Sequence, residues 1–148
     1  MPNQSTIQTQ MDLFLGKAPN VDANGVIDNI SYKRNVVAKV ADYTAKASES
    51  GTLFTSEGAT ADIEFTLPAL ADGLEFIFFN AEDIEMVVSS AADNTMVASG
   101  DAAAGHITFT TATVQIGCGV TVICDGSKWM CLMHIGNSGS LPAPVAVT

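Results

Sequence analysis

The sequence has few basic and few aromatic residues for its length. Lys and Arg number 6 against 16 Asp and Glu, so the net charge over 148 residues is −10, and there are one Trp and two Tyr. Binding to nucleic acid or to an anionic membrane surface depends on clustered Lys and Arg, and the composition argues against both partners. The shortage of Trp and Tyr also disfavours an aromatic platform for sugars.

Long hydrophobic runs and paired cysteines are missing as well. No run approaches the roughly 18 apolar residues that cross a bilayer, and the N-terminus is polar, without the apolar segment of a secretory signal. The three cysteines, Cys118, Cys124 and Cys131, are an odd number without the CxxC spacing of zinc sites. We therefore expect buried free thiols in a protein assembled in the cytoplasm, and neither a metal nor a cofactor.

What is abundant is apolar content, at 47% of the residues, with only 15% charged. A free monomer usually needs a more charged surface, so we expect other subunits to cover part of this one. The charge is also uneven. Residues 1–46 hold five bases and four acids, whereas residues 47–148 hold one base and twelve acids. This asymmetry indicates two parts with different surroundings.

Residues 1–35 are predicted to form an extended N-terminal arm. The segment is mostly polar, but Leu13, Phe14 and Leu15 form a compact apolar cluster before a Gly and a Pro. A segment with so few apolar residues cannot build its own core. The cluster must therefore dock on this domain or on a partner.

Residues 36–136 carry the pattern of an all-β domain. A first strand is expected at about 36–45, and alternation of apolar and polar residues predicts further strands, with a hairpin at the Asp-Gly turn of "CDGSKW". Seven to nine short strands spaced 8–12 residues apart are typical of a sandwich or barrel. The fold class expected is a single antiparallel β-sandwich or barrel-like domain, followed by a tail at 137–148.

The alternation also assigns side chains to faces. In "TADIEFTLP", Ile63, Phe65 and Leu67 should line the core while Asp62 and Glu64 face outward. The strand "LEFIFFN" is apolar on both faces. Phe76 and Phe78 should serve the core, whereas Ile77 and Phe79 need a second cover and are predicted to lie at a subunit interface.

Candidate reactive groups all have a structural interpretation that we favour. Asp62 and Glu64 could form a hydrolase pair, and the cluster Glu82, Asp83 and Glu85 could hold calcium, but solvated strand faces and turns alternate in the same way. Phosphate-loop and GxSxG signatures are missing from the sequence. A Cys–His nucleophile would need a His beside an exposed thiol, which nothing local supports. No catalytic residue is predicted, and an enzyme is the weakest of three hypotheses.

Two segments carry a resemblance. In "ADYTAKASESGTLFTSEGATADIEFTLPALADGLEFIFFN", 41–80, a Tyr-Thr start is followed by a Ser-Gly, a Gly-Ala-Thr turn, a "FTLPxA" strand end and an aromatic-rich strand. The closing "CDGSKWMCLMHIG", 124–136, has an Asp-Gly turn before a Trp. Both resemble a β-module of tailed-bacteriophage virion proteins. The motifs are turns and core positions, so the resemblance implies a structural role rather than catalysis.

Proteins that look like this are capsid decoration (cement) proteins, usually trimers on the outer shell, or fibre and spike modules. Because the module is nearly the whole of this chain and follows an arm rather than a shaft, we expect a decoration protein on the outer capsid surface, forming a homotrimer. Its partner would be the major capsid protein. The arm residues expected to contact the capsid are Met11, Leu13, Phe14, Leu15, Lys17, Tyr32, Lys33 and Arg34. The alternative is a host-binding, carbohydrate-binding module of a fibre or spike.

Overall fold

The computed structural model describes residues 20–21, 27–28, 33–110, 116–134 and 145–147. The chain divides into two compact units, Met1–Lys33 and Arg34–Thr148. In the first unit, β1 (Asn20–Val21) pairs with β2 (Ile27–Asp28) in an antiparallel ladder. The remaining elements belong to the second unit.

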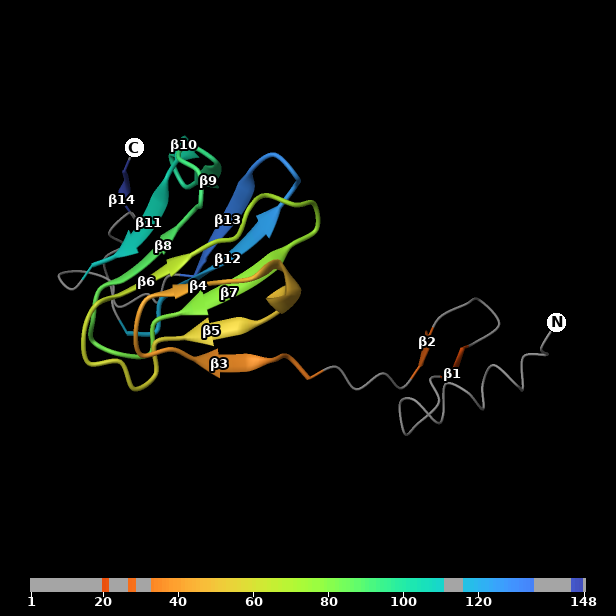
Figure 1. The fold of residues 1–148 in the computed structure, drawn as a ribbon, viewed down its shortest axis with the longest axis horizontal. Helices are drawn as coiled ribbons and strands as arrows, with labels where there is room; N and C mark the ends of the chain where they lie inside the picture. The colour runs from red at the N-terminus through yellow and green to blue at the C-terminus, as the bar shows by residue number, and fades with distance from the viewer. Residues whose placement is uncertain (1–19, 22–26, 29–32, 111–115, 135–144, 148) are drawn as a thin grey trace. The chain divides into compact units, whose positions relative to one another are not determined.

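The second unit is a sandwich of two β-sheets (Figure 1), which confirms the all-β prediction. A single 3₁₀ turn, η1 (Ala47–Glu49), interrupts the strands in the described part of this unit. In chain order the strands are β3 (Val36–Ala38), β4 (Tyr43–Thr44), β5 (Leu53–Thr55), β6 (Ile63–Thr66), β7 (Glu75–Phe79), β8 (Met86–Ser89), β9 (Met96–Ala98), β10 (Asp101–Ala104), β11 (His106–Phe109), β12 (Gly119–Cys124), β13 (Trp129–His134) and β14 (Val145–Val147).

One sheet has seven strands in the order β10-β9-β13-β12-β7-β5-β3, and the other has five in the order β14-β11-β8-β6-β4. From β3 to β8 the chain alternates between them, so that each strand pairs with the strand two places later. These pairs are parallel: β3 with β5, β5 with β7, β4 with β6, and β6 with β8.

The parallel pairs differ from the antiparallel pairing expected for the whole domain. Antiparallel ladders do form where β12 pairs with β7 and β13, and where β11 pairs with β8 and β14. The reason for the difference is that the early connections do not turn back within one sheet. They carry the chain across to the opposite sheet, and the next strand of the same sheet then arrives in the original direction.

The strand expected at 36–45 is two strands in different sheets. β3 ends at Ala38, and β4 begins at Tyr43 in the five-stranded sheet. The β-branched Val40, which favoured one continuous strand, lies in the connection and is 64% exposed. The residues of this connection still favour strand, so the pattern of β-branched residues does not show that the chain changes sheets here.

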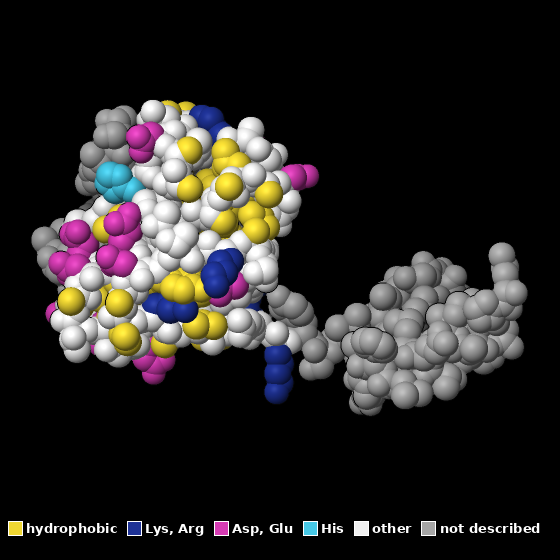
Figure 2. Space-filling model, in the orientation of Figure 1, with side chains coloured by type: hydrophobic (Ala, Val, Ile, Leu, Met, Phe, Trp, Pro, Cys, Tyr) yellow, Lys and Arg dark blue, Asp and Glu magenta, His cyan; other side chains and the backbone are white. Residues whose placement is uncertain are grey.

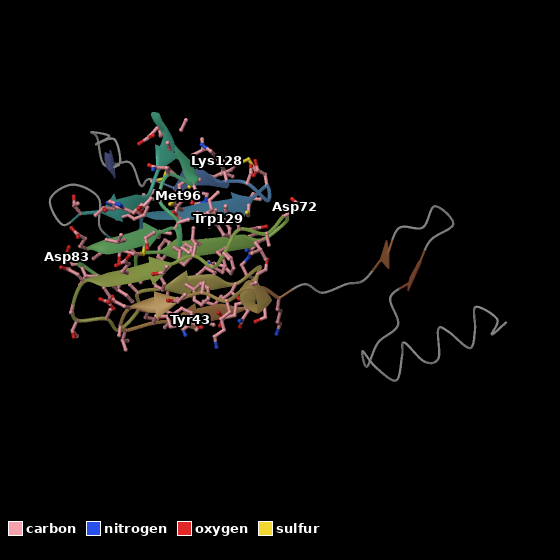
Figure 3. All side chains as sticks on the ribbon, turned by 45° about the horizontal axis from the view of Figure 1, so that its top comes forward. Tyr43, Asp72, Asp83, Met96, Lys128 and Trp129 are labelled. Carbon is pink, nitrogen blue, oxygen red and sulfur yellow. The ribbon has the colours of Figure 1, made fainter. Side chains whose placement is uncertain are left out.

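The core between the sheets is built largely from aromatic rings. Phe54 lies at its centre, with ring centroids 5.4 Å from Tyr43, 5.7 Å from Phe78 and 6.1 Å from Phe65. Trp129 on β13 extends the cluster, 6.0 Å from Phe76. Tyr43 and Trp129 lie toward opposite ends of this group of rings (Figure 3). Tilted contacts at these distances are favourable for aromatic pairs.

The predicted faces of 62–67 and 76–79 are confirmed. Ile63, Phe65 and Leu67 are at most 2% exposed, whereas Asp62 and Glu64 are exposed. Phe76 and Phe78 are fully buried.

A buried polar pair fixes the ends of the two connections that follow β5 and β7. The Ser56 hydroxyl donates to Asn80 Oδ1 at 2.6 Å, and the Asn80 amide donates to the carbonyl of Ile84 at 2.9 Å. Because both side chains are fully buried and hydrogen-bonded, they hold the connections in place without the cost of an unsatisfied polar group.

Candidate interaction surface

The outer face of the seven-stranded sheet is the surface that points away from the five-stranded sheet. Alternation along β7 places Ile77 and Phe79 on it, half-buried and 39% exposed. Alternation along β13 buries Trp129 and places Met130 and Leu132 outward, 42% and 55% exposed. Both strands are apolar on two faces, so the apolar residues continue outside the core.

The strand register aligns these outward residues in three rows across the sheet. The middle row contains Leu132, Thr121, Ile77, Leu53 and Val36. The row on one side contains His134, Gly119, Phe79, Thr55 and Ala38. The row on the other side contains Val97, Met130, Ile123 and Glu75. Together the rows define the outer apolar face.

Most of the exposed large hydrophobic side chains of the described chain lie on this face. Among the described residues seven such side chains are exposed, and five belong to the rows: Val36, Phe79, Val97, Met130 and Leu132. The other two, Val40 and Ile116, lie in connections. Isolated exposed hydrophobic residues are ordinary, but aligned ones on a single sheet face mark an interaction surface.

Charge is sparse in the three rows. Glu75 is their one carboxylate, and its Oε1 lies 3.5 Å from Arg34 Nη1. Arg34 also donates a hydrogen bond to the carbonyl of Gly51 at 3.3 Å. At the opposite end of the sheet, Thr121 Oγ1 and His134 Nε2 are 2.7 Å apart. The face therefore offers apolar contact, with Glu75 and His134 in its two side rows and Thr121 in its middle row.

The structure describes only some of the residues predicted to contact the capsid or another subunit. Met11, Leu13, Phe14, Leu15, Lys17 and Tyr32 lie outside the described residues. Lys33 is exposed, whereas Arg34 is half-buried and bound to Gly51 and Glu75. Ile77 and Phe79 lie side by side with other apolar residues in adjacent rows, and the subunit contact predicted for them stays a prediction.

Sequence reasoning missed most of this face. Val36, Leu53, Met130 and Leu132 were not predicted to surround Ile77 and Phe79. A signal for β13 was present in "SKWMCLMHIG", because Met130 and Leu132 alternate with Trp129, Cys131 and Met133 and make that strand apolar on both faces. Residues of β3 and β5 could not have been placed there without the parallel register.

The outer face of the five-stranded sheet has a different character. It carries an open polar groove with a volume of about 560 Å³. Figure 2 shows acidic side chains and a histidine close together on this face. The groove is lined by Glu64, Thr66, Glu85, Val87, Ser89, Ser90, Ala91, Asp93, Gly105, His106 and Thr108. It has no aromatic lining residue, and the Ser89 hydroxyl is already bound to Glu64 Oε1 at 2.6 Å.

Two of the carboxylates considered as hydrolase or calcium candidates, Asp62 and Glu82, accept hydrogen bonds from backbone amides. Asp62 accepts a hydrogen bond from the amide of Glu85 at 2.9 Å, and Glu82 accepts one from the amide of Gly58 at 2.8 Å. Within the described parts of the chain, no three acidic, His or Cys side chains are arranged to hold a metal ion. These bonds explain the acidic residues as acceptors for turn and strand-end amides.

The three cysteines are free thiols that lie in or beside the core. Cys118 is buried directly before β12, and Cys124 is buried at the end of that strand. Cys131 is partly buried with Trp129 and Met133 on the inward face of β13. Burial raises the pKa of Cys131 to about 12. A thiol held in its protonated form is a weak nucleophile at neutral pH.

Basic residues gather where β3, η1 and β4 meet. Lys39 Nζ lies 3.3 Å from the centroid of the Tyr43 ring, and the Tyr43 hydroxyl donates to Glu49 at 2.7 Å. The hydrogen bond to Glu49 raises the pKa of Tyr43. For Glu49, partial burial is outweighed by the bonds from Tyr43 and Lys46 and by nearby positive charge, so its pKa is lowered. Figure 2 shows Lys and Arg side chains beside β4, away from the acidic groove.

No protein-family model and no curated protein matches this chain. Among the residues that the structure describes, none of the helical segments could cross a membrane. The functional interpretation therefore depends on the surfaces just described.

Proposed function

We propose that the protein is a structural component of a tailed-phage virion, a decoration protein that binds the outer capsid surface as a homo-oligomer, a trimer, and stabilises the shell. The residues of the resembling segments support this. Gly58 and Gly126 adopt positive φ in turns, while Phe65, Leu67 and Trp129 fill the core. These are turn and core positions, the kinds of position that carry the resemblance.

The observation that carries the proposal is the division of charge over the second unit. Arg34, Lys39 and Lys46 surround the start of the domain, and Lys33 directly precedes it in the chain. Later in the chain Lys128 is the single base among many acids. A domain with this distribution can attach through its basic beginning and arm while its acidic remainder repels other particles and keeps them in solution.

Sedimentation with bare capsids that lack this protein tests the proposal. The full chain should co-sediment, and deletion of residues 2–30 should abolish binding while the remaining chain stays folded and oligomeric. Weak arm contacts repeated within a trimer gain avidity on a lattice, so the loss should exceed the effect of any single arm substitution. Unchanged affinity of the deletion variant would refute the arm's role.

A matched pair of substitutions tests whether capsid binding depends on the location of a lysine or only on the net charge of the chain. Lys39→Glu and Lys128→Glu change the net charge equally, but only Lys39 lies at the basic end. We expect weaker capsid binding from Lys39→Glu and little change from Lys128→Glu. Equal effects would mean that net charge alone controls binding.

The second candidate function is host attachment through a carbohydrate, and the polar groove on the five-stranded sheet is the observation that favours it. Its carboxylates and hydroxyls could accept and donate bonds to sugar hydroxyls. A glycan array with the isolated protein decides between the two. Specific binding that is lost in Glu85→Gln would support attachment, whereas an array without signal leaves the decoration function as the proposal.

A further inference from the structure

We propose that the outer apolar face of the seven-stranded sheet is the surface through which copies of this chain contact one another. The inference deepens the proposed function and rests on it for the kind of assembly, whereas its test requires no capsid. The occupant of the face is a second copy of this chain.

The dimensions of the face suit the apolar centre of such a contact rather than the whole of it. The rows cross six strands, β9, β13, β12, β7, β5 and β3. With strands about 4.8 Å apart and rows about 7 Å apart they span roughly 24 by 14 Å, on the order of 300 Å² before side-chain width is added. A stable interface covers about 800 Å² on each partner and has an apolar centre with a polar rim. The three rows can form that centre, and His134 and the Arg34–Glu75 pair lie where the rim would begin.

The shape of the face favours another sheet as its partner. Outward side chains on regular strands form ridges with a fixed spacing, and two sheets pack when the ridges of one enter the grooves of the other, about 10 Å apart. A second copy presents the same spacing, and in the proposed trimer these faces would turn toward one threefold axis, so that each copy contacts two others. The large side chains Leu132, Ile77 and Leu53 share a row with the smaller Thr121, which is 9% exposed and whose Oγ1 lies 2.7 Å from His134 Nε2.

The distribution of charge over the surface favours the same face as the contact between copies. Each chain carries a net charge of −10, so copies repel one another over most of their surfaces. In the rows the one carboxylate, Glu75, is already paired with Arg34. Approach through this face therefore meets less repulsion than approach through the acidic groove of the five-stranded sheet, where Glu64, Glu85 and Asp93 would face their own copies.

Mass measurement by sedimentation equilibrium tests the inference on the full chain. The wild type should have at least twice the chain mass of 15.4 kDa, and three times that mass for the proposed trimer. Leu132→Asp should lower the association constant by about 100-fold or more, because burying an unpaired carboxylate is costly. Val40→Asp is the matched control, because Val40 is 64% exposed but lies outside the rows. It should leave the mass unchanged.

Two further variants, Met130→Asp and Phe14→Asp, complete the test. Met130→Asp repeats the test on the neighbouring row and decides the matter if circular dichroism shows that Leu132→Asp is unfolded. Folded monomers of the row variants, together with an oligomeric Val40→Asp, support the inference. A monomeric wild type, or row variants that keep the wild-type mass, overturn it. It also fails if Phe14→Asp dissociates the oligomer and Leu132→Asp does not, since the arm then makes the contact.

Discussion

At the scale of single residues, Gly119 shows how closely β12 and β7 approach. It stands in an outer row between His134 and Phe79, and a Cβ atom at this position would collide with the backbone carbonyl oxygen of Phe78. Backbone atoms cannot move aside as a flexible side chain can. Position 119 therefore requires glycine, because the backbone of β7 leaves no room for a Cβ atom.

Gly119→Ala should lower the free energy of unfolding by about 1–3 kcal/mol, the usual cost of forcing extra atoms into a packed site. Gly105→Ala is the control, because its Cβ would meet only Asp93 Oδ1 at 3.7 Å, an ordinary contact. Urea denaturation of both variants measures the difference. Equal stability of the two variants would show that β7 and β12 separate easily.

Phe54 and Phe79 provide a second comparison at this scale. Phe54 is fully buried with four aromatic neighbours, whereas Phe79 is 39% exposed on the outer face. Phe54→Ala should cost about 3–5 kcal/mol of unfolding free energy. Phe79→Ala should cost the monomer less than about 1 kcal/mol. Chemical denaturation at low protein concentration measures both, and a larger loss at Phe79 would contradict the assignment of faces.

At the scale of elements, the hairpin between β12 and β13 depends on one carboxylate. Asp125 Oδ1 accepts hydrogen bonds from the amides of Lys128 and Ser127 at 2.7 and 2.8 Å and from the Ser127 hydroxyl at 2.8 Å. These bonds, the one from Lys128 first, lower the pKa of Asp125. The Asp-Gly turn was visible in the sequence, and the carboxylate explains why Asp occupies its first position.

Asp125→Ala should lower the melting temperature at neutral pH. A lowered pKa in the folded protein means that the stabilisation is present above the ordinary value of 3.8 and is lost as the pH falls through the lower folded value. The difference between wild type and variant should therefore shrink below about pH 3.8. Asp125→Asn keeps one acceptor oxygen and should lie between them. A difference independent of pH would exclude the ionised carboxylate as its cause.

At this scale the sequence predicted which side chains face the core but not the sheet to which each strand belongs. Alternation placed Ile63, Phe65 and Phe76 in the core, because a strand with one buried face leaves a period of two. It could not reveal that 63–66 and 75–79 belong to different sheets. Pro68 and Gly73 mark a corner in the chain, but a corner within one sheet and a crossing between two sheets use the same residues. The outer apolar face depends on that crossing and was only partly predicted.

At the scale of the whole molecule, the net charge should control self-association. Copies with a charge of −10 repel one another, whereas their proposed contact surface is nearly uncharged. Salt screens the repulsion and leaves the apolar contact in place. Sedimentation equilibrium at about 20 mM and about 500 mM salt should show tighter association at the higher concentration. Dissociation by salt would indicate an interface held by ion pairs instead.

The alternation of β3 to β8 between two sheets also has a consequence for how such a domain could lengthen. Each pair of successive strands forms a coil that adds one strand to both sheets, and β3 and β4 end the two sheets on the same side (Figure 1). A further coil inserted before β3 could pair in parallel with β3 in one sheet and with β4 in the other. Every existing strand pair would stay intact. The domain is in this sense extensible at its beginning, whereas β10 and β14 at the other ends of the two sheets join their neighbours in antiparallel pairs. Related chains that differ in length should therefore differ first in the number of coils near the N-terminal side of the sandwich.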